Sequence, residues 1–265
     1  MQNASTVFFL LLFVSAPNFA QSPYSISWKN DGLIMGSSAA ISLFAVSLND
    51  SLHVLTPAER FALNKNSINI FDRWATNFAS VELSQASDLL VGACIVAPAG
   101  LLLFDKNIGS DWQTISTMYA ETALLATFLP SLGKGPAKRI RPYLYNPNAP
   151  LKLQQDDEAN RSFFSGHTTW SFASMTFLAV VYSDFYPNSK YKTAVWTVSM
   201  SAASAVGLMR IFSGAHFPSD VLLGALVGGT IGYGIPYLHR VSSSSVGVVP
   251  SPFGGMQLSL SVPLR

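Results

Sequence analysis

Six long apolar segments dominate the hydrophobic pattern of this chain. Short polar stretches separate them, and they cover residues 31–48, 86–104, 111–132, 166–186, 192–210 and 218–238. Each approaches the ~20 residues that a helix needs to cross the hydrocarbon core of a bilayer. The pattern therefore predicts an all-α fold, a transmembrane bundle of six helices.

The last of these segments carries glycines at four-residue steps, Gly224, Gly228 and Gly232. This spacing places all three on one face of a helix, where the missing side chains let a neighbouring helix backbone come close. We expect this face to be a helix–helix contact.

The stretch from Leu55 to Phe78 between the first two apolar segments has a different pattern. It reads LTPAERFALNKNSINIFDRWATNF, with charged and apolar residues mixed as in amphipathic helices. Thr56 followed by Pro57 is typical of an N-cap and the first helical residue. We expect amphipathic surface helices between the first two core helices, on the protein surface or at the membrane interface.

The two ends of the chain differ from its centre. Residues 1–20 have the short apolar stretch of a secretory signal peptide, although they lack early basic residues and could instead be a retained membrane anchor. Residues 21–241 form the predicted helical domain. The polar tail, residues 242–265, contains the alternating MQLSLSV, which fits a short strand pair or a disordered segment.

Composition supports a membrane protein. Hydrophobic residues make up 49% of the chain and charged residues 11%, whereas an ordinary soluble domain is about 25% charged. The net charge of +2 is too small to indicate nucleic-acid binding. Cys94 is the single cysteine, so an internal disulfide and a thiolate metal cluster are both excluded.

Three polar motifs lie at the ends of the apolar segments. The first is KGPAKRIRP, from Lys134 to Pro142. An arginine offers a planar fork and a lysine a point charge, so Lys134 and Arg141 suit an oxyanion. A basic loop beside a membrane span can equally be a topology signal or a contact to lipid headgroups.

The second motif is FFSGHTTW, in which Ser165 and Gly166 precede an apolar run and indicate a helix start. Free N–H groups at a helix N-terminus bind anions, and His167 in the first turn can exchange a proton near neutral pH. A capping serine and an interfacial histidine are the structural alternative.

The third motif is RIFSGAHFPSD, from Arg210 to Asp220. Asp220 follows His216 by four residues, so it could accept a hydrogen bond from one imidazole nitrogen and leave the other free as a nucleophile. A purely structural pair between Arg210 and Asp220 is the alternative. All three motifs fall on one side of the predicted bundle, where they would combine cations, helix N–H groups, a nucleophile and an acid.

In order and spacing these motifs resemble the type 2 phosphatidic acid phosphatase superfamily, which includes membrane lipid phosphatases, soluble class A acid phosphatases and vanadium haloperoxidases. The matching residues are Lys134-x6-Arg141-Pro142, Ser165-Gly166-His167 and Arg210-x5-His216-x3-Asp220. Two positions depart from the family pattern. Phe164 stands where a proline is usual, and Met209 where a serine is usual.

The resemblance implies a role for each residue. His216 would attack phosphorus and form a phosphohistidine, Asp220 would orient His216, and His167 would protonate the leaving group and then activate water. The phosphoryl oxygens would be held by Lys134, Arg141, Arg210, Ser165 and Gly166. No metal and no cofactor is expected.

The implied function is hydrolysis of a phosphate monoester or pyrophosphate, with a phosphorylated lipid or a small phosphomonoester as substrate. We expect a bacterial-type cell envelope protein, either in the inner membrane with the site facing the periplasm or free in the periplasm. A soluble broad-specificity acid phosphatase, a vanadate-dependent haloperoxidase and a non-enzymatic membrane protein remain alternatives.

Two further titratable residues lie outside the motifs. Glu121 sits inside an apolar segment, where a buried carboxylate needs a polar partner. We expect a hydrogen bond to a serine or threonine of a neighbouring helix, with a role beneath the active site as the alternative. His239 has no partner nearby in sequence and is predicted to lie on the surface.

Overall fold

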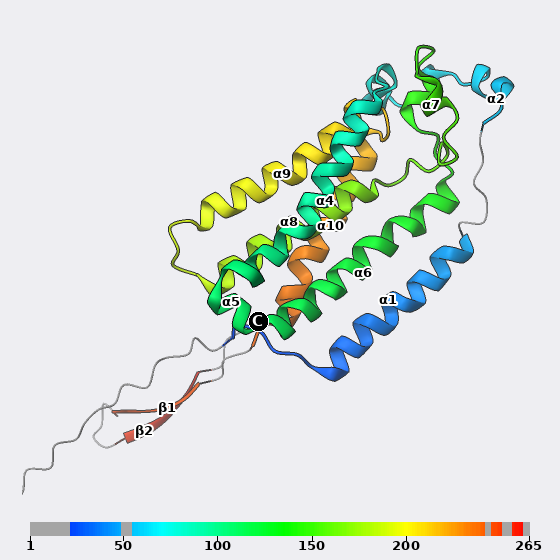
Figure 1. Cartoon of the computed structure of the whole chain (residues 1–265). Helices are drawn as coiled ribbons and strands as arrows, with labels where there is room; N and C mark the ends of the chain where they lie inside the picture. Colours follow the sequence, from blue (N-terminus) through cyan, green and yellow to red (C-terminus); the bar gives the residue numbers. More distant parts are fainter. Residues whose placement is uncertain (1–21, 49–54, 242–244, 251–255, 262–265) are drawn as a thin grey trace, which may run out of the picture.

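The computed structural model describes residues 22–48, 55–241, 245–250 and 256–261. Within them, six long helices form an antiparallel bundle in which successive helices alternate in direction (Figure 1). This confirms the predicted all-α bundle. The helices are α1 (Trp28–Leu48), α4 (Val81–Phe104), α6 (Trp112–Ala137), α8 (Gly166–Phe185), α9 (Lys192–Phe212) and α10 (Pro218–His239).

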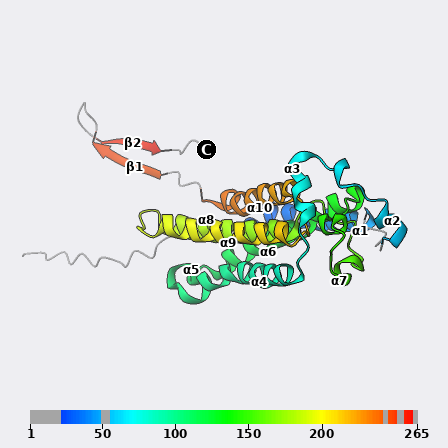
Figure 2. The same cartoon turned by 90° about the horizontal axis from the view of Figure 1, so that it is seen from above.

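Several short elements gather at one end of the bundle, as Figure 2 shows for α2, α3 and α7, whereas α5 lies at the opposite end. The segment between α1 and α4 folds as predicted into short helices, and the Thr56 N-cap is confirmed by a capping box with Glu59. The short elements are α2 (Pro57–Phe61), η1 (Lys65–Ser67), α3 (Ile70–Arg73), η2 (Trp74–Asn77), α5 (Lys106–Ser110), η3 (Pro142–Tyr145) and α7 (Leu151–Gln154).

Helix α8 is the centre of the bundle and packs against α4, α6, α9 and α10. Most of its side chains are buried, including Phe177 and Val181 in the main hydrophobic cluster. Two of its hydroxyls turn back onto main-chain oxygens: Thr169 donates to the oxygen of Ser165 at 2.9 Å and Ser171 to that of Thr168 at 3.1 Å. Serine and threonine are therefore tolerated in a helix that protein encloses on several sides.

Helices α8 and α10 approach so closely that side chains do not fit between them. A Cβ added at Gly224, Gly228 or Gly232 would lie 2.7, 2.3 and 2.3 Å from main-chain oxygens of α8 or its N-cap. The predicted glycine face is thus confirmed as a contact between helix backbones.

Three helices of the described chain, α4, α9 and α10, are long and apolar enough to cross a membrane. Side chains such as Leu89, Val96, Leu103 and Leu226 point their apolar surface outward, with 66–79% of it exposed. The protein is therefore membrane-associated. Fewer helices than the expected six meet this criterion of length and composition; the apolar part of α1, for example, is short, Asp31–Ala45.

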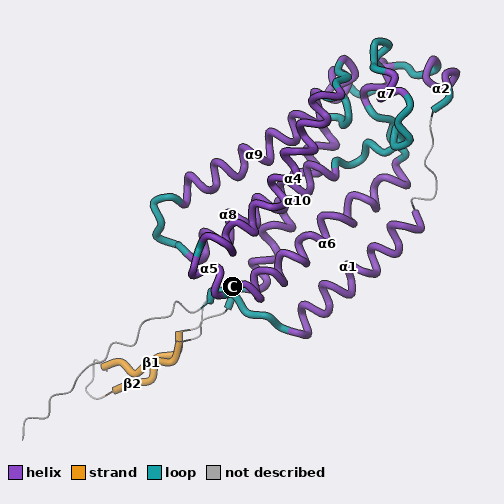
Figure 3. The backbone as a smooth tube through the Cα atoms, in the orientation of Figure 1, coloured by secondary structure: helices purple, strands orange, loops and turns teal. Residues whose placement is uncertain are grey.

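Beyond α10, strands β1 (Ser245–Pro250) and β2 (Met256–Ser261) pair antiparallel, with Ser245 opposite Ser261. They lie in the tail where the sequence suggested a strand pair. Figure 3 shows that strands occur only here among the described residues and that loops gather at the ends of the helices. The predicted signal peptide, residues 1–20, lies outside the described residues.

Replacing Gly228 with alanine tests the close contact. The added methyl group would meet the main-chain oxygen of Thr169, which cannot rotate away, so we expect Gly228→Ala to lower the free energy of unfolding by about 1–3 kcal/mol. Thermal unfolding of the protein in detergent measures this.

Gly229→Ala is the matched control, because a Cβ at Gly229 meets nothing within 4 Å. This variant should be as stable as the wild type or slightly more stable. Equal stability losses in the two variants would contradict the close contact.

Candidate active site

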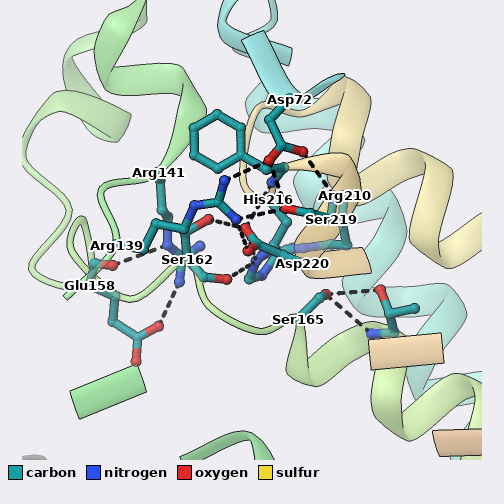
Figure 4. A network of polar contacts seen from close by, with 12 residues as sticks. Asp72, Arg139, Arg141, Glu158, Ser162, Ser165, Arg210, His216, Ser219 and Asp220 are labelled. Carbon is teal, nitrogen blue, oxygen red and sulfur yellow. Dashed lines mark hydrogen bonds and ion pairs between the residues drawn. The ribbon is translucent and has the colours of Figure 1, made fainter. Parts of the chain in front are cut away.

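The three sequence motifs meet at one end of the bundle, where α6 and α9 end and α8 and α10 begin (Figure 1). The first motif lies at the end of α6 and in the following loop, the second starts α8, and the third joins α9 to α10. The side chains from these places form the polar network of Figure 4.

The loop that carries His216 is fixed by tight backbone contacts. Gly214 has φ +73°, and a Cβ there would lie 2.1 Å from the main-chain oxygen of Phe78. Only glycine fits this position. The main-chain N–H groups of Ala215 and His216 both donate to the oxygen of Arg210, at 3.1 and 3.2 Å. The imidazole therefore has little freedom to move.

His216 is 2% exposed, and its Nδ1 lies 2.6 Å from the main-chain oxygen of Ser162. A carbonyl oxygen can only accept, so Nδ1 carries the proton and Nε2 presents a lone pair. Burial, followed by the positive charges of Arg141, Arg210 and Lys134, lowers the pKa of His216 well below its ordinary value. The ring is therefore neutral at neutral pH, the form that a nucleophile requires.

Asp220 does not bond directly to His216, which differs from the expected geometry. Its Oδ2 lies 3.9 Å from Nδ1 of His216. Instead Oδ2 accepts from the hydroxyl of Ser162 at 2.6 Å and from the main-chain N–H of Phe217 at 3.0 Å. Asp220 thus acts on His216 through Ser162, whose hydroxyl it holds while the main-chain oxygen of Ser162 holds the ring (Figure 4).

Arg139 connects Asp220 to the surface helices. Its guanidinium pairs with Asp220 and, at 2.8 Å, with Asp72 of α3, and it lies 4.1 Å from the ring centre of Phe217. Asp72 also accepts from the main-chain N–H and the hydroxyl of Ser219. Burial alone would raise the pKa of Asp72, but hydrogen bonds from its neighbours outweigh burial and lower it. Asp72 is therefore ionised, and its hydrogen bonds with Ser219 fix the start of α10.

Arg141 and Arg210 are the buried cations of the site, 6% and 4% exposed. Arg141 bonds to Glu158 through its carboxylate at 2.9 Å and its main-chain oxygen at 3.1 Å. One nitrogen of Arg210 donates to hydroxyls of α4 and, at 3.2 Å, to Asp88. The Nε–H of Arg210 is enclosed and has no acceptor among the described residues. A buried donor without an acceptor is costly unless a bound group completes it.

His167 lies in the first turn of α8, and its Nε2 is 2.8 Å from Asp88. Asp88 therefore links His167 to Arg210, and the second and third motifs share one carboxylate. Ser165 is the N-cap of α8 and accepts from the main-chain N–H and the hydroxyl of Thr168, at 3.4 and 2.9 Å. Gly166 begins α8, as the sequence predicted, and it lines a groove on the surface of the bundle.

A groove of about 290 Å³ runs from this site along the surface between α4, α6 and α8. Lys134, Gly166 and His167 line its polar part. Its remaining walls are mainly apolar and include Val91, Ile95, Ala126, Pro130 and Trp170. The groove can therefore accept a molecule with an anionic head and an apolar tail.

Sequence reasoning missed the residues that support the motif side chains: Asp72, Asp88, Arg139 and Ser162. Arg139 lies inside the first motif, but its partner Asp72 comes from a surface helix 67 residues earlier. Asp88 was detectable, because it is an acidic residue near the start of an apolar segment. Ser162 holds the His216 ring through its main-chain oxygen, which leaves no signal in the residue type, and its hydroxyl donates to Asp220, a residue distant in sequence.

Part of the chain is similar to known lipid phosphatases. The family description "PAP2 superfamily" matches residues 116–243. A probable diacylglycerol pyrophosphate phosphatase 1 of Schizosaccharomyces pombe is 40% identical over 78 residues, 28% of each chain. A lipid A 1-phosphatase of Porphyromonas gingivalis is 40% identical over 87 residues, 32% of this chain and 18% of that protein.

A lipid phosphate phosphatase 1 of Arabidopsis thaliana is 37% identical over 82 residues, 29% of this chain and 25% of that protein. The matches thus span less than a third of each of these relatives. The crystal structure of a transmembrane PAP2 type phosphatidylglycerolphosphate phosphatase from Bacillus subtilis has a TM-score of 0.46 and 23% identity, covering 76% of this chain and 94% of that one. The resemblance read from the sequence motifs is confirmed: the part of this chain that matches the PAP2 superfamily, residues 116–243, contains all three motifs.

Proposed function

We propose that this protein hydrolyses a phosphate monoester or pyrophosphate of a lipid through a phosphohistidine on His216, without a metal ion at the reacting phosphorus. The observation that carries the proposal is the state of His216. A neutral ring presents the lone pair of Nε2 among the charges of Lys134, Arg141 and Arg210. A nucleophile surrounded by cations suits a phosphoryl group with several anionic oxygens.

In the first step the Nε2 lone pair of His216 forms a bond to phosphorus, and the bond from phosphorus to the leaving oxygen breaks. That oxygen takes a proton from His167 and departs as an alcohol or a shorter phosphate. Arg141 and Arg210 hold the phosphoryl oxygens, and the unpartnered Nε–H of Arg210 gains its acceptor.

In the second step His167 takes a proton from water, and the water oxygen bonds to phosphorus. The P–N bond then breaks, which releases orthophosphate and returns the lone pair to His216. Asp88 bonds to His167 in both steps and orients its ring. Lys134 and the start of α8 at Ser165 and Gly166 supply further positive potential to the oxygens.

The groove supports a lipid as the substrate. Lys134 and His167 lie at its polar part, while its remaining walls are mainly apolar and run along helices that carry exposed apolar side chains. An acyl or isoprenoid tail could thus enter from the membrane while its phosphate meets the cations. The three similar proteins, which are named as phosphatases of phosphorylated lipids, favour the same class.

We place the protein in the inner membrane of a bacterial-type envelope with the site facing the periplasm. The signal-like N-terminal residues and the three apolar helices support this location. Cell fractionation tests it. Recovery in the membrane fraction, released only by detergent, is expected, whereas release by buffer alone would favour a free periplasmic acid phosphatase.

The activity is tested by phosphate release from phosphatidic acid, phosphatidylglycerol phosphate, undecaprenyl pyrophosphate, lipid A and a soluble phosphomonoester. We expect at least one lipid to be the best substrate and His216→Ala to reduce turnover to background, because the nucleophile is lost. Asp157→Asn, a change of an exposed acidic residue, is the control and should keep full activity. Turnover of the soluble ester alone would refute the lipid substrate.

The acid role of His167 is tested by changing the leaving group. With a lipid phosphate, His167→Ala should lower kcat by about 10²–10⁴, because an alkoxide cannot leave without a proton. With p-nitrophenyl phosphate the leaving group needs no proton, so formation of the phosphoenzyme should slow far less. Single-turnover kinetics measure this step, and an equal loss with both substrates would contradict the role.

A further inference from the structure

At the opposite end of the bundle, far from the active site, three buried titratable side chains meet. They are Asp31 at the start of α1, Glu121 of α6 and His239 at the end of α10 (Figure 1). Their exposed fractions are 4%, 0% and 4%. Nε2 of His239 lies 3.0 Å from Asp31 and 3.4 Å from Glu121. The predictions of a surface position for His239 and a hydroxyl partner for Glu121 are therefore wrong.

The tautomer of His239 is fixed by its main-chain contact. Nδ1 lies 2.8 Å from the oxygen of Ile235, one helical turn earlier, and this carbonyl can only accept. Nδ1 therefore carries a proton, and in the neutral ring the lone pair of Nε2 points at Asp31 and Glu121. Three electron-rich atoms then face one another, which requires a proton or a cation between them.

A proton on Nε2 would satisfy the cluster only in part. It would serve Asp31 at 3.0 Å, whereas both oxygens of Glu121 are enclosed without a hydrogen-bond partner among the described residues. An imidazolium with two carboxylates also keeps a net charge of −1. Enclosed charge without compensation is strongly unfavourable. A divalent cation, in contrast, would contact all three ligand atoms and neutralise both carboxylates.

The geometry also suits a metal ion. Tetrahedral bonds of about 2.1 Å separate neighbouring ligand atoms by about 3.4 Å. The two distances from His239 are 3.0 and 3.4 Å, and all three ligand atoms lie within 4.8 Å of one another. The supporting contacts are of the expected kind, because His239 donates Nδ1–H to a carbonyl and Asp31 accepts from the N–H of Ser27 at 3.0 Å.

We propose that Asp31, Glu121 and His239 bind one divalent transition-metal ion, with Zn²⁺ as the reference ion. One imidazole and two carboxylates form a ligand set that such ions accept, and a water molecule or the second oxygen of Glu121 can complete the coordination. The ion has a structural role. Helix α1 packs mainly on α6, and the ion links it to α10 as well.

Metal binding is tested on the full chain, purified in detergent without a histidine tag, treated with a chelator and titrated with Zn²⁺ by calorimetry. We expect one Zn²⁺ per chain. With Zn²⁺ at about 100 times its dissociation constant, Tm should rise by about 5–10 °C. Co²⁺ should give a visible absorption band that Zn²⁺ removes.

Glu121→Gln keeps the shape of the side chain and removes its charge, so it should abolish both the zinc stoichiometry and the rise in Tm. Asp184→Asn is the matched control. Asp184 lies at the same end and pairs with Arg240 and Tyr24, outside the cluster, so zinc binding should persist in this variant.

Wild-type protein that binds no Zn²⁺ and shows no change in Tm would overturn the proposal. The three side chains would then form ion pairs with one another and bind no metal. Zinc binding by Glu121→Gln with wild-type affinity would overturn it equally. If Glu121→Gln does not fold, the Co²⁺ spectrum of the wild type decides. The visible band is expected only if the nitrogen and oxygen ligands of this site bind the ion.

Discussion

The hydrogen bond from Nδ1 of His216 to the main-chain oxygen of Ser162 is the contact on which the proposed chemistry of this protein depends. It fixes the proton on one ring nitrogen and leaves the lone pair of the other available. Ser162 is also held from the other side, where its hydroxyl donates to Asp220, which in turn pairs with Arg139. The loop between α9 and α10 is held in place by this chain of contacts, and the buried Asp72 of α3 contributes by pairing with Arg139.

Helix packing provides the distances that this arrangement needs. The close approach of α10 to α8 brings Gly224 against the main-chain oxygen of Ser165, and the N–H of Ser165 donates to the main-chain oxygen of Asp220 at 3.2 Å. The starts of the two helices are therefore joined, and the second and third motifs cannot separate without opening the glycine contact. The small residues that allow dense packing in a membrane thereby also set the geometry of the site.

Much of the fold could be predicted from the sequence, because long apolar segments and glycine spacing depend on local periodicity. That the three motifs meet at one end of the bundle could also be predicted, since all three lie at ends of the apolar segments. Arg139, Asp72 and Ser162 could not, because each acts through a partner that is distant in sequence or through its main chain. The pairing of His239 with two carboxylates was missed for the same reason. It joins α1, α6 and α10, and no sequence spacing links these positions.

The central claim is that Nε2 of His216 and the two buried arginines, Arg141 and Arg210, contact the same tetrahedral anion. A crystal structure of the protein with orthovanadate tests this most directly, because vanadate adopts the five-coordinate geometry of phosphoryl transfer. We expect vanadium bonded to Nε2 of His216, with its oxygens accepting from Arg141 and from the Nε–H of Arg210. Vanadium bonded to His167, or bound away from both arginines, would contradict the claim.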